Sequence, residues 1–131
     1  GDYTPPSRFV RMVALVSSAL PVTGADAGLN LAMTIIDNAD IARGTIRDSS
    51  GKEPTYDTTD WSVVADIGNK RYYFRTYDNK DWRYIDVNKA LAEATGIMSI
   101  PIKTPPEYKN VTDSAQKVGT LPDNMFPAGK P

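Results

Sequence analysis

The chain has 131 residues, a formal net charge of −1, and neither cysteine nor histidine. Its hydrophobic content of 40% and charged content of 24% are ordinary for a folded globular protein. The lack of a basic excess argues against nucleic acid or an anionic membrane surface as a partner. Without cysteine or histidine, this chain alone cannot build a disulfide, a thiolate or imidazole metal site, or a histidine base.

The opening residues predict a loop that leads directly into a helix. Thr4 is the expected N-cap, and Pro5 falls at the first helical position, where its missing N–H costs nothing. We expect the helix to end near Leu20, because Pro21 cannot continue it. Apolar residues recur at helical spacing and are typical of a helix packed on a core: Phe9, Val13, Val16 and Leu20, widened by Met12 and Leu15.

Arg8 stands in the first turn of this helix, against the usual charge preference. The helix dipole is positive there, so a cation is disfavoured by about 0.3–1 kcal/mol. One interpretation is that Arg8 is solvated or pairs with Asp2. The other is that Arg8 is held in place to meet an anion, such as a thiolate, a carboxylate or a developing oxyanion. Position alone leaves both open.

A second helix follows after a short joint. Thr23 and Asp26 form a plausible capping pair. The inward stripe of this helix is apolar and consists of Ala25, Leu29, Ala32, Met33 and Ile36. Two consecutive helices with wide apolar faces predict antiparallel packing in one layer. Residues 43–57 are polar and rich in turn residues, which predicts an exposed loop.

The periodicity then changes from helical to twofold, which predicts a three-stranded antiparallel meander over residues 61–67, 71–77 and 82–87. The middle strand carries aromatic residues on both faces, Tyr72 and Phe74 on one and Tyr73 and Tyr77 on the other. We therefore expect the helices to cover one face and something outside this chain to cover the other.

Beyond the meander the predicted elements are short. Residues 88–94 predict a short helix, and residues 97–102 an edge strand or an extended docking segment. Residues 103–131 are polar and spaced by prolines, which indicates an extended tail. The predicted organisation is thus a domain part over residues 1–102 and a tail over 103–131.

Two further patterns consist of residue types that can carry chemistry. Three pairs of aspartates are each spaced by three residues, which could serve acid–base catalysis or bind a cation; they are Asp37 and Asp40, Asp57 and Asp60, and Asp78 and Asp81. All flank turns, so we predict solvated turn residues. Residues 71–77 combine arginines with aromatic rings like a nucleic-acid platform, but the chain is net negative. No cofactor or metal is predicted.

Three segments resemble the choloylglycine hydrolase family, which includes penicillin V acylases and conjugated bile acid hydrolases. They are Gly-Asp-Tyr-Thr-Pro-Pro-Ser-Arg-Phe-Val-Arg at residues 1–11, Asp-Ile-Ala-Arg-Gly at 40–44, and Tyr-Tyr-Phe-Arg-Thr-Tyr-Asp-Asn at 72–79. They occur in the expected order and cover roughly residues 1–87. In this family an N-terminal cysteine is the nucleophile of an amidase, and the arginine that matches Arg8 lies beside it in the active site.

The resemblance implies an α+β fold, in which two helices pack on an antiparallel sheet as part of an αββα sandwich. It implies hydrolysis of a linear amide, such as a penicillin, a bile acid conjugate or an acyl homoserine lactone, with Arg8 as the one catalytic residue in this chain. The partners would be a cysteine-bearing segment or chain of the same enzyme and a small amide substrate, in a homo-oligomer without nucleic acid or membrane. A bacterial periplasmic or secreted location is expected. The alternative is a non-catalytic α+β binding or assembly module.

Overall fold

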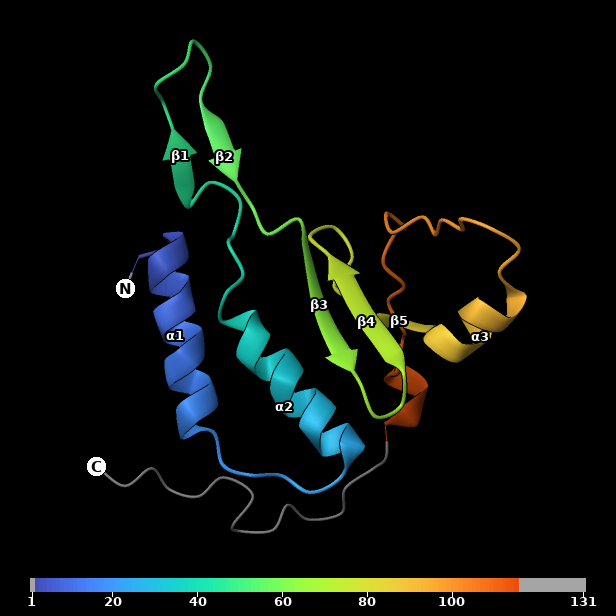
Figure 1. Ribbon diagram of the computed structural model, residues 1–131. Helices are drawn as coiled ribbons and strands as arrows, with labels where there is room; N and C mark the ends of the chain where they lie inside the picture. Colours follow the sequence, from blue (N-terminus) through green and yellow to red (C-terminus); the bar gives the residue numbers. More distant parts are fainter. Residues whose placement is uncertain (1, 116–131) are drawn as a thin grey trace.

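The computed structural model describes residues 2–115 and is an α+β fold (Figure 1). Its helices are α1 (Pro5–Ser18), α2 (Ala25–Asp37) and α3 (Val87–Glu93), followed by a short 3-10 helix at Thr112–Ser114. Its strands are β1 (Ile46–Asp48), β2 (Thr55–Asp57), β3 (Trp61–Asp66), β4 (Arg71–Thr76) and β5 (Arg83–Asp86). No helix among these residues is long and apolar enough to cross a membrane.

The two long helices form as predicted, but their caps differ. Thr4 is the N-cap of α1, yet its side chain makes no capping bond; its hydroxyl donates to Asp2 Oδ1 at 2.6 Å instead. The predicted capping pair of α2 is wrong, because Gly24 is the N-cap, at a φ of 94° that favours glycine. Helix α1 ends at Ser18, two residues before Leu20.

Helix α2 packs directly on β3, whereas α1 packs on α2. The apolar residues predicted to face a core from α1 are therefore exposed in the described chain, with Phe9 69%, Val16 63% and Leu20 81% exposed. The half-buried side of α1 instead carries Met12 and Leu15, the two residues expected only to widen the stripe. The α1 stripe has the predicted spacing, but α2 does not cover it.

Residues 43–57 are exposed but contain a hairpin that the sequence analysis missed. Strands β1 and β2 pair antiparallel, with Arg47 opposite Tyr56. The hairpin projects from the rest of the fold beyond the start of α1 (Figure 1). The strands are short and a polar, turn-rich stretch separates them, so their local strand signal is weak.

The predicted meander is confirmed as a three-stranded sheet in the order β3-β4-β5. All six residues of β3 pair with β4, from Trp61 opposite Thr76 to Asp66 opposite Arg71. In the turn between them, Lys70 adopts the left-handed backbone conformation, with a φ of 56°. Helix α3 follows β5 at once and is capped by Asp86, whose carboxylate accepts from the Lys89 amide at 3.0 Å.

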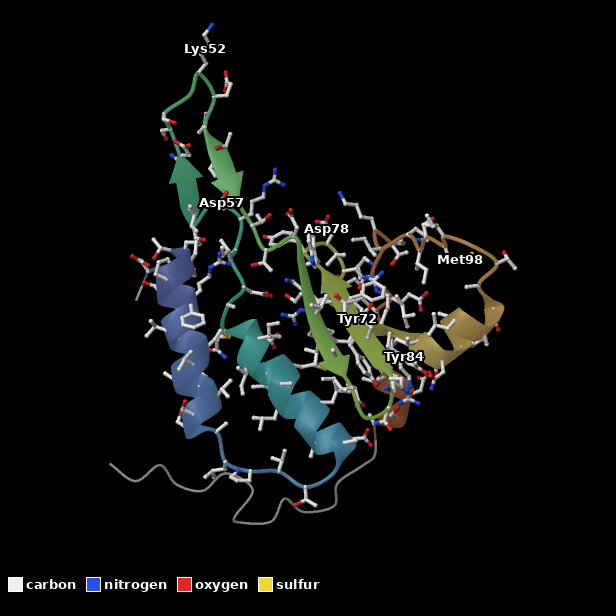
Figure 2. The ribbon with its side chains drawn as sticks, viewed as in Figure 1. Lys52, Asp57, Tyr72, Asp78, Tyr84 and Met98 are labelled. Carbon is white, nitrogen blue, oxygen red and sulfur yellow. The ribbon has the colours of Figure 1, made fainter. Side chains whose placement is uncertain are left out.

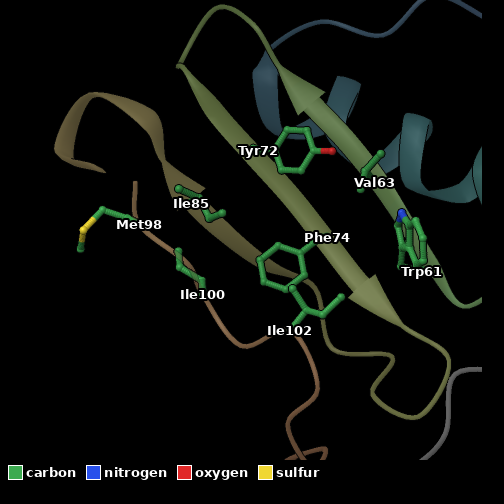
Figure 3. A pocket seen from close by; sticks show the side chains of 8 residues that line it. All are labelled: Trp61, Val63, Tyr72, Phe74, Ile85, Met98, Ile100 and Ile102. Atoms are coloured by element: carbon green, nitrogen blue, oxygen red, sulfur yellow. The ribbon is translucent and has the colours of Figure 1, made fainter. Parts of the chain in front are cut away.

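The two faces of the sheet are covered differently. Arg75 faces the end of α2, while Phe74 faces the opposite side, where Ile100 and Ile102 lie beside it (Figure 3). That second face was expected to be covered from outside the chain, but residues 98–102 of this chain cover part of it. These residues are extended and form no strand.

The chain beyond residue 102 is tied to the sheet by polar contacts. Asn79 is 3% exposed, and its side-chain amide donates to the Thr104 carbonyl at 3.1 Å and to the Pro105 carbonyl at 3.0 Å. The Glu107 amide donates to Asp81 at 3.0 Å. These contacts hold residues 104–107 beside the sheet, whereas Thr112–Ser114 form the 3-10 helix. The rest of the predicted tail, 116–131, lies outside the described residues. The domain division at residue 102 stays a prediction.

Candidate active site

Arg8, the sequence-predicted site residue, lies in the first turn of α1 and lines a cleft of about 470 Å³. Its backbone amide donates to the Thr4 carbonyl at 3.0 Å, which fixes Arg8 at the helix start. No acidic residue stands in this first turn. The positive end of the helix dipole and the guanidinium therefore both favour a negative charge in the cleft.

The cleft lies between the start of α1 and the base of the hairpin. One wall is the segment that leads into α1, and the other comes from residues 41–57; the lining residues are Asp2, Tyr3, Thr4, Pro5, Arg8, Ile41, Thr45, Ile46, Arg47 and Asp57. Figure 2 shows Asp57 at the base of the hairpin, close to the start of α1. The walls thus carry two carboxylates and two guanidinium groups.

Arg8 has no side-chain partner within residues 2–115, as is also true of Arg43, which is exposed. Arg8 is half-buried, and its Nε is shielded from solvent without a hydrogen bond. The Nε atoms of Arg75 and Arg83 are also unbonded, but their guanidinium groups bind Asp40 and the Ile102 carbonyl, each at 2.8 Å. Arg8 makes no ion pair with Asp2, so the pairing that the sequence left open does not form.

The carboxylate of Asp2 is engaged by its own neighbours. Hydrogen bonds from Ser7 and Thr4 lower the pKa of Asp2 from its ordinary 3.8 to about 2. The Thr4 amide and hydroxyl both donate to Asp2 Oδ1, at 3.0 and 2.6 Å. Asp2 is therefore ionised at neutral pH and is already satisfied by donors other than Arg8.

An ion network around the buried Arg75 fixes the wall opposite Arg8. Arg75, which is 7% exposed, binds Asp37 at 2.5 Å and Asp40 at 2.8 Å. Ser62 donates to Asp40 at 3.2 Å, and Lys80 binds the same carboxylate at 3.0 Å. The prediction that Asp37 and Asp40 are solvated turn residues is therefore wrong. The network anchors Asp40, which directly precedes the cleft wall.

Ile41, which follows Asp40, is 4% exposed and is part of the cleft wall opposite Arg8. Its amide donates to the Thr59 hydroxyl at 2.8 Å, and its carbonyl accepts from the Thr59 amide at 3.3 Å. Two residues on, the Arg43 amide donates to the Tyr77 hydroxyl at 3.1 Å. The sheet and α2 thus determine where the wall facing Arg8 stands.

Two hairpin residues of the cleft were not predicted as site residues: Arg47, which the sequence analysis did not single out, and Asp57, which it predicted to be a solvated turn residue. The available signal was a pair of short β-forming stretches, Thr45-Ile-Arg and Thr55-Tyr, on either side of a polar turn. The guanidinium of Arg47 lies 5.3 Å from the centroid of the Tyr56 ring. No three acidic side chains within residues 2–115 gather closely enough to hold a metal ion.

The sequence matches a known family of hydrolases and is similar to two bile salt hydrolase/transferases. The family model described as linear amide C-N hydrolases, choloylglycine hydrolase family, matches residues 1–99. A bile salt hydrolase/transferase from Lactiplantibacillus plantarum is 26% identical over 108 residues, covering 82% of this chain and 32% of that protein. Another from Clostridium perfringens is 30% identical over 89 residues, covering 68% and 26%.

Solved structures agree on the fold. The crystal structure of a mutant conjugated bile acid hydrolase from Clostridium perfringens superposes with a TM-score of 0.63 at 23% identity, over 85% of this chain and 33% of that one. A second variant of the same hydrolase gives the same values. The chain therefore spans about a third of the length of the proteins it matches.

Proposed function

Because this chain belongs to the choloylglycine hydrolase family of linear amide C–N hydrolases, we propose that it supplies the Arg8 side of an amidase active site. The observation that carries the proposal is the half-buried guanidinium of Arg8, which lines a cleft at the start of α1 and has no side-chain partner in residues 2–115. The chain has no cysteine, so the nucleophile comes from an N-terminal cysteine on another segment or chain of the same enzyme.

In this proposal the cysteine supplies both the nucleophile and the base. Its α-amino group takes the thiol proton, and the sulfur attacks the carbonyl carbon of the amide. The C–N bond breaks, the amine leaves with that proton, and a thioester remains. Water then attacks the thioester, releases the carboxylic acid and restores the thiol.

Arg8 acts in this scheme through its charge. A fixed cation beside the sulfur favours the thiolate and lowers the pKa of the thiol. The dipole of α1 acts in the same direction. The cleft walls other than Arg8 include Asp2, which is already held by Thr4, so the guanidinium is left for the sulfur or for the oxyanion that forms during attack.

The substrate is proposed from the relatives. Two of them are bile salt hydrolase/transferases, which makes a bile acid conjugate the first amide to test. A penicillin side-chain amide and an acyl homoserine lactone are the other two in the predicted substrate class. A homo-oligomer in the bacterial periplasm or outside the cell belongs to the same proposal.

The test uses this chain assembled with its cysteine-bearing segment. We expect Arg8→Ala to lower turnover of a glycine-conjugated bile acid by about a hundredfold or more, as loss of a charge-stabilising donor does. In Arg8→Ala the pKa of the cysteine thiol, measured from the pH dependence of its alkylation by iodoacetamide, should rise by about one unit or more. Arg8→Lys should recover part of both. Lys52→Ala, at the tip of the hairpin, removes one positive charge elsewhere and should change neither. Wild-type turnover in Arg8→Ala would contradict the assignment.

A non-catalytic binding or assembly module is the second candidate, and the absence of cysteine favours it. Mass spectrometry of the protein purified from its source separates the two. A polypeptide with an N-terminal cysteine, joined to this chain or bound to it, supports the amidase. A lone species of 14.3 kDa that hydrolyses none of the three amides supports the module.

A further inference from the structure

The Nε of Arg8 is a hydrogen-bond donor that residues 2–115 leave without an acceptor. It is shielded from solvent, and it belongs to a half-buried side chain that lines the cleft. Shielded N–H groups in native proteins nearly always have a partner. The first turn of α1 fixes the backbone of Arg8 but not the orientation of its guanidinium. A long side chain that acts on a sulfur needs a second group that holds it in position.

Asp57 is the carboxylate of this cleft that no donor holds within residues 2–115. The other carboxylate, that of Asp2, accepts from the amide and the hydroxyl of Thr4. Asp57 lines the cleft from the hairpin, and the ion pairs of the described chain involve only Asp37 and Asp40 as acidic partners. An unpaired guanidinium and an unpaired carboxylate therefore line the same cleft from opposite walls.

The register of the hairpin places Asp57 on its cleft side. Ile46 and Asp57 are partners in the pairing of β1 with β2, so their side chains share one face, and the next pair, Arg47 and Tyr56, shares the other. Ile46 is half-buried, whereas Arg47 and Tyr56 are exposed. Arg47 also borders the cleft, but its guanidinium lies over the Tyr56 ring at 5.3 Å. Asp57, close to the start of α1, is thus the charged hairpin residue turned toward that helix (Figure 2).

We propose that Asp57 is the positioning residue of Arg8 and that its carboxylate accepts hydrogen bonds from Nε and one Nη of the guanidinium across the cleft. This inference rests on the proposed function, because the pair forms in the enzyme assembled with its cysteine-bearing segment. In the described chain Asp57 is exposed and forms no ion pair with Arg8. A segment that brings the cysteine to the cleft displaces water from it, and a charge pair strengthens as the local dielectric constant falls. A planar two-bond pair leaves the second Nη for the sulfur or the oxyanion.

Steady-state kinetics of the assembled enzyme test the pair first. We expect Asp57→Ala to lower kcat for a glycine-conjugated bile acid at least tenfold and to change KM less than twofold, because Asp57 orients Arg8 and does not bind the substrate. Asp57→Asn keeps an acceptor oxygen and should recover part of kcat. Glu53→Ala removes one negative charge from the tip of the same hairpin and should change neither constant. A wild-type kcat in Asp57→Ala overturns the proposal.

The double variant distinguishes positioning from a structural role. In the Arg8→Ala background, Asp57→Ala should lower kcat less than twofold further, since Asp57 acts only through Arg8. A further loss as large as in the wild-type background overturns the proposal.

Nuclear magnetic resonance of the Arg8 Nε–H group gives a readout that does not depend on turnover. The signal is assigned by its absence from Arg8→Lys, and in the assembled enzyme we expect it to exchange slowly with water. In Asp57→Ala its exchange should be at least tenfold faster, whereas Glu53→Ala should leave it unchanged. Equal exchange in Asp57→Ala and the wild type overturns the pair. Exchange that depends on Asp57, together with wild-type turnover in Arg8→Ala, supports the pair and contradicts the catalytic role of Arg8, so the two proposals fail separately.

Discussion

The sheet side of α2 and the outer side of α1 show how differently two similar sequence patterns can be used. Where the end of α2 meets the sheet, the strand residues Arg75 and Ser62 are each 7% exposed, and both bind Asp40. On α1, Phe9 is 69% exposed. Both helices have amphipathic sequences. The comparison teaches that periodicity identifies the face of a helix to be covered, but not whether the covering part belongs to the same chain.

The largest expected effect concerns the packed region. Arg75→Ala leaves the Asp37 and Asp40 carboxylates beside each other without their shared guanidinium, and also removes the stacking of Arg75 on Trp82 at 4.8 Å. We expect the assembled protein to lose about 3 kcal/mol of unfolding free energy, the lower end for a broken buried pair, because Asp37 is half exposed. Urea unfolding measures this loss.

Arg75→Lys is the matched control for that prediction. It keeps one charge but cannot reach both carboxylates with a planar fork, so it should recover part of the stability. A midpoint for Arg75→Ala equal to that of the wild type would show that the network does not hold α2 to the sheet.

Next in size is a pair of apolar truncations, one on each helix. Ile36→Ala removes a half-buried side chain of α2 and should cost about 2 kcal/mol, at the low end for a large-to-small change. Val16→Ala on α1 should cost well under 1 kcal/mol in this chain by itself, since Val16 is 63% exposed. In the assembled protein we expect Val16→Ala to cost about 1 kcal/mol more than in the chain alone. Thermal unfolding of both forms measures the difference, and an equal cost in both would show that no other segment covers Val16 in the assembled protein.

Much of this fold follows from local sequence signals. Proline at the start of α1 and the change to a twofold period at Trp61 predict a helix and a meander, and both are confirmed. The cap contacts could not be predicted in the same way, because the Thr4 hydroxyl donates to the nearby Asp2 carboxylate and accepts no hydrogen bond from a helix amide. The burial of Asn79 and the ion pairs of Arg75 join residues 25 to 38 positions apart, which no local pattern reveals.

The candidate site likewise contains one residue that the sequence predicted and a wall that it did not. Arg8 was predicted from its unusual place in the first turn and from a family resemblance that the comparisons support, although its catalytic role stays a prediction. The opposite wall could not be predicted, because the hairpin residues Arg47 and Asp57 reach the cleft only through the packing of residues 40–46 on the sheet. Charge and local propensity predict which residues are unusual; tertiary contacts decide what they face.

A smaller effect is expected for Lys80→Ala, at the exposed end of the ion network. The ammonium lies 3.0 Å from Asp40, but its side chain is 50% exposed, so solvent screens the pair. We expect a loss below about 1 kcal/mol in the urea experiment. A loss as large as that of Arg75→Ala would mean that Lys80, rather than the buried arginine, holds Asp40 in place.

The smallest effect concerns pH and the start of α1. The folded pKa of Asp2 is about 2 against an ordinary 3.8, so its ionised form favours the folded state. The contribution is complete above pH 3.8 and disappears as the pH falls through about 2. We expect the Thr4 amide, which donates to Asp2, to shift in NMR spectra over this acid range. Asp2→Asn should abolish that shift and leave the one at Ser50, whose amide donates to Asp48 on the hairpin. A Thr4 transition centred near pH 4 would show that the Asp2 bonds do not order the loop before Arg8.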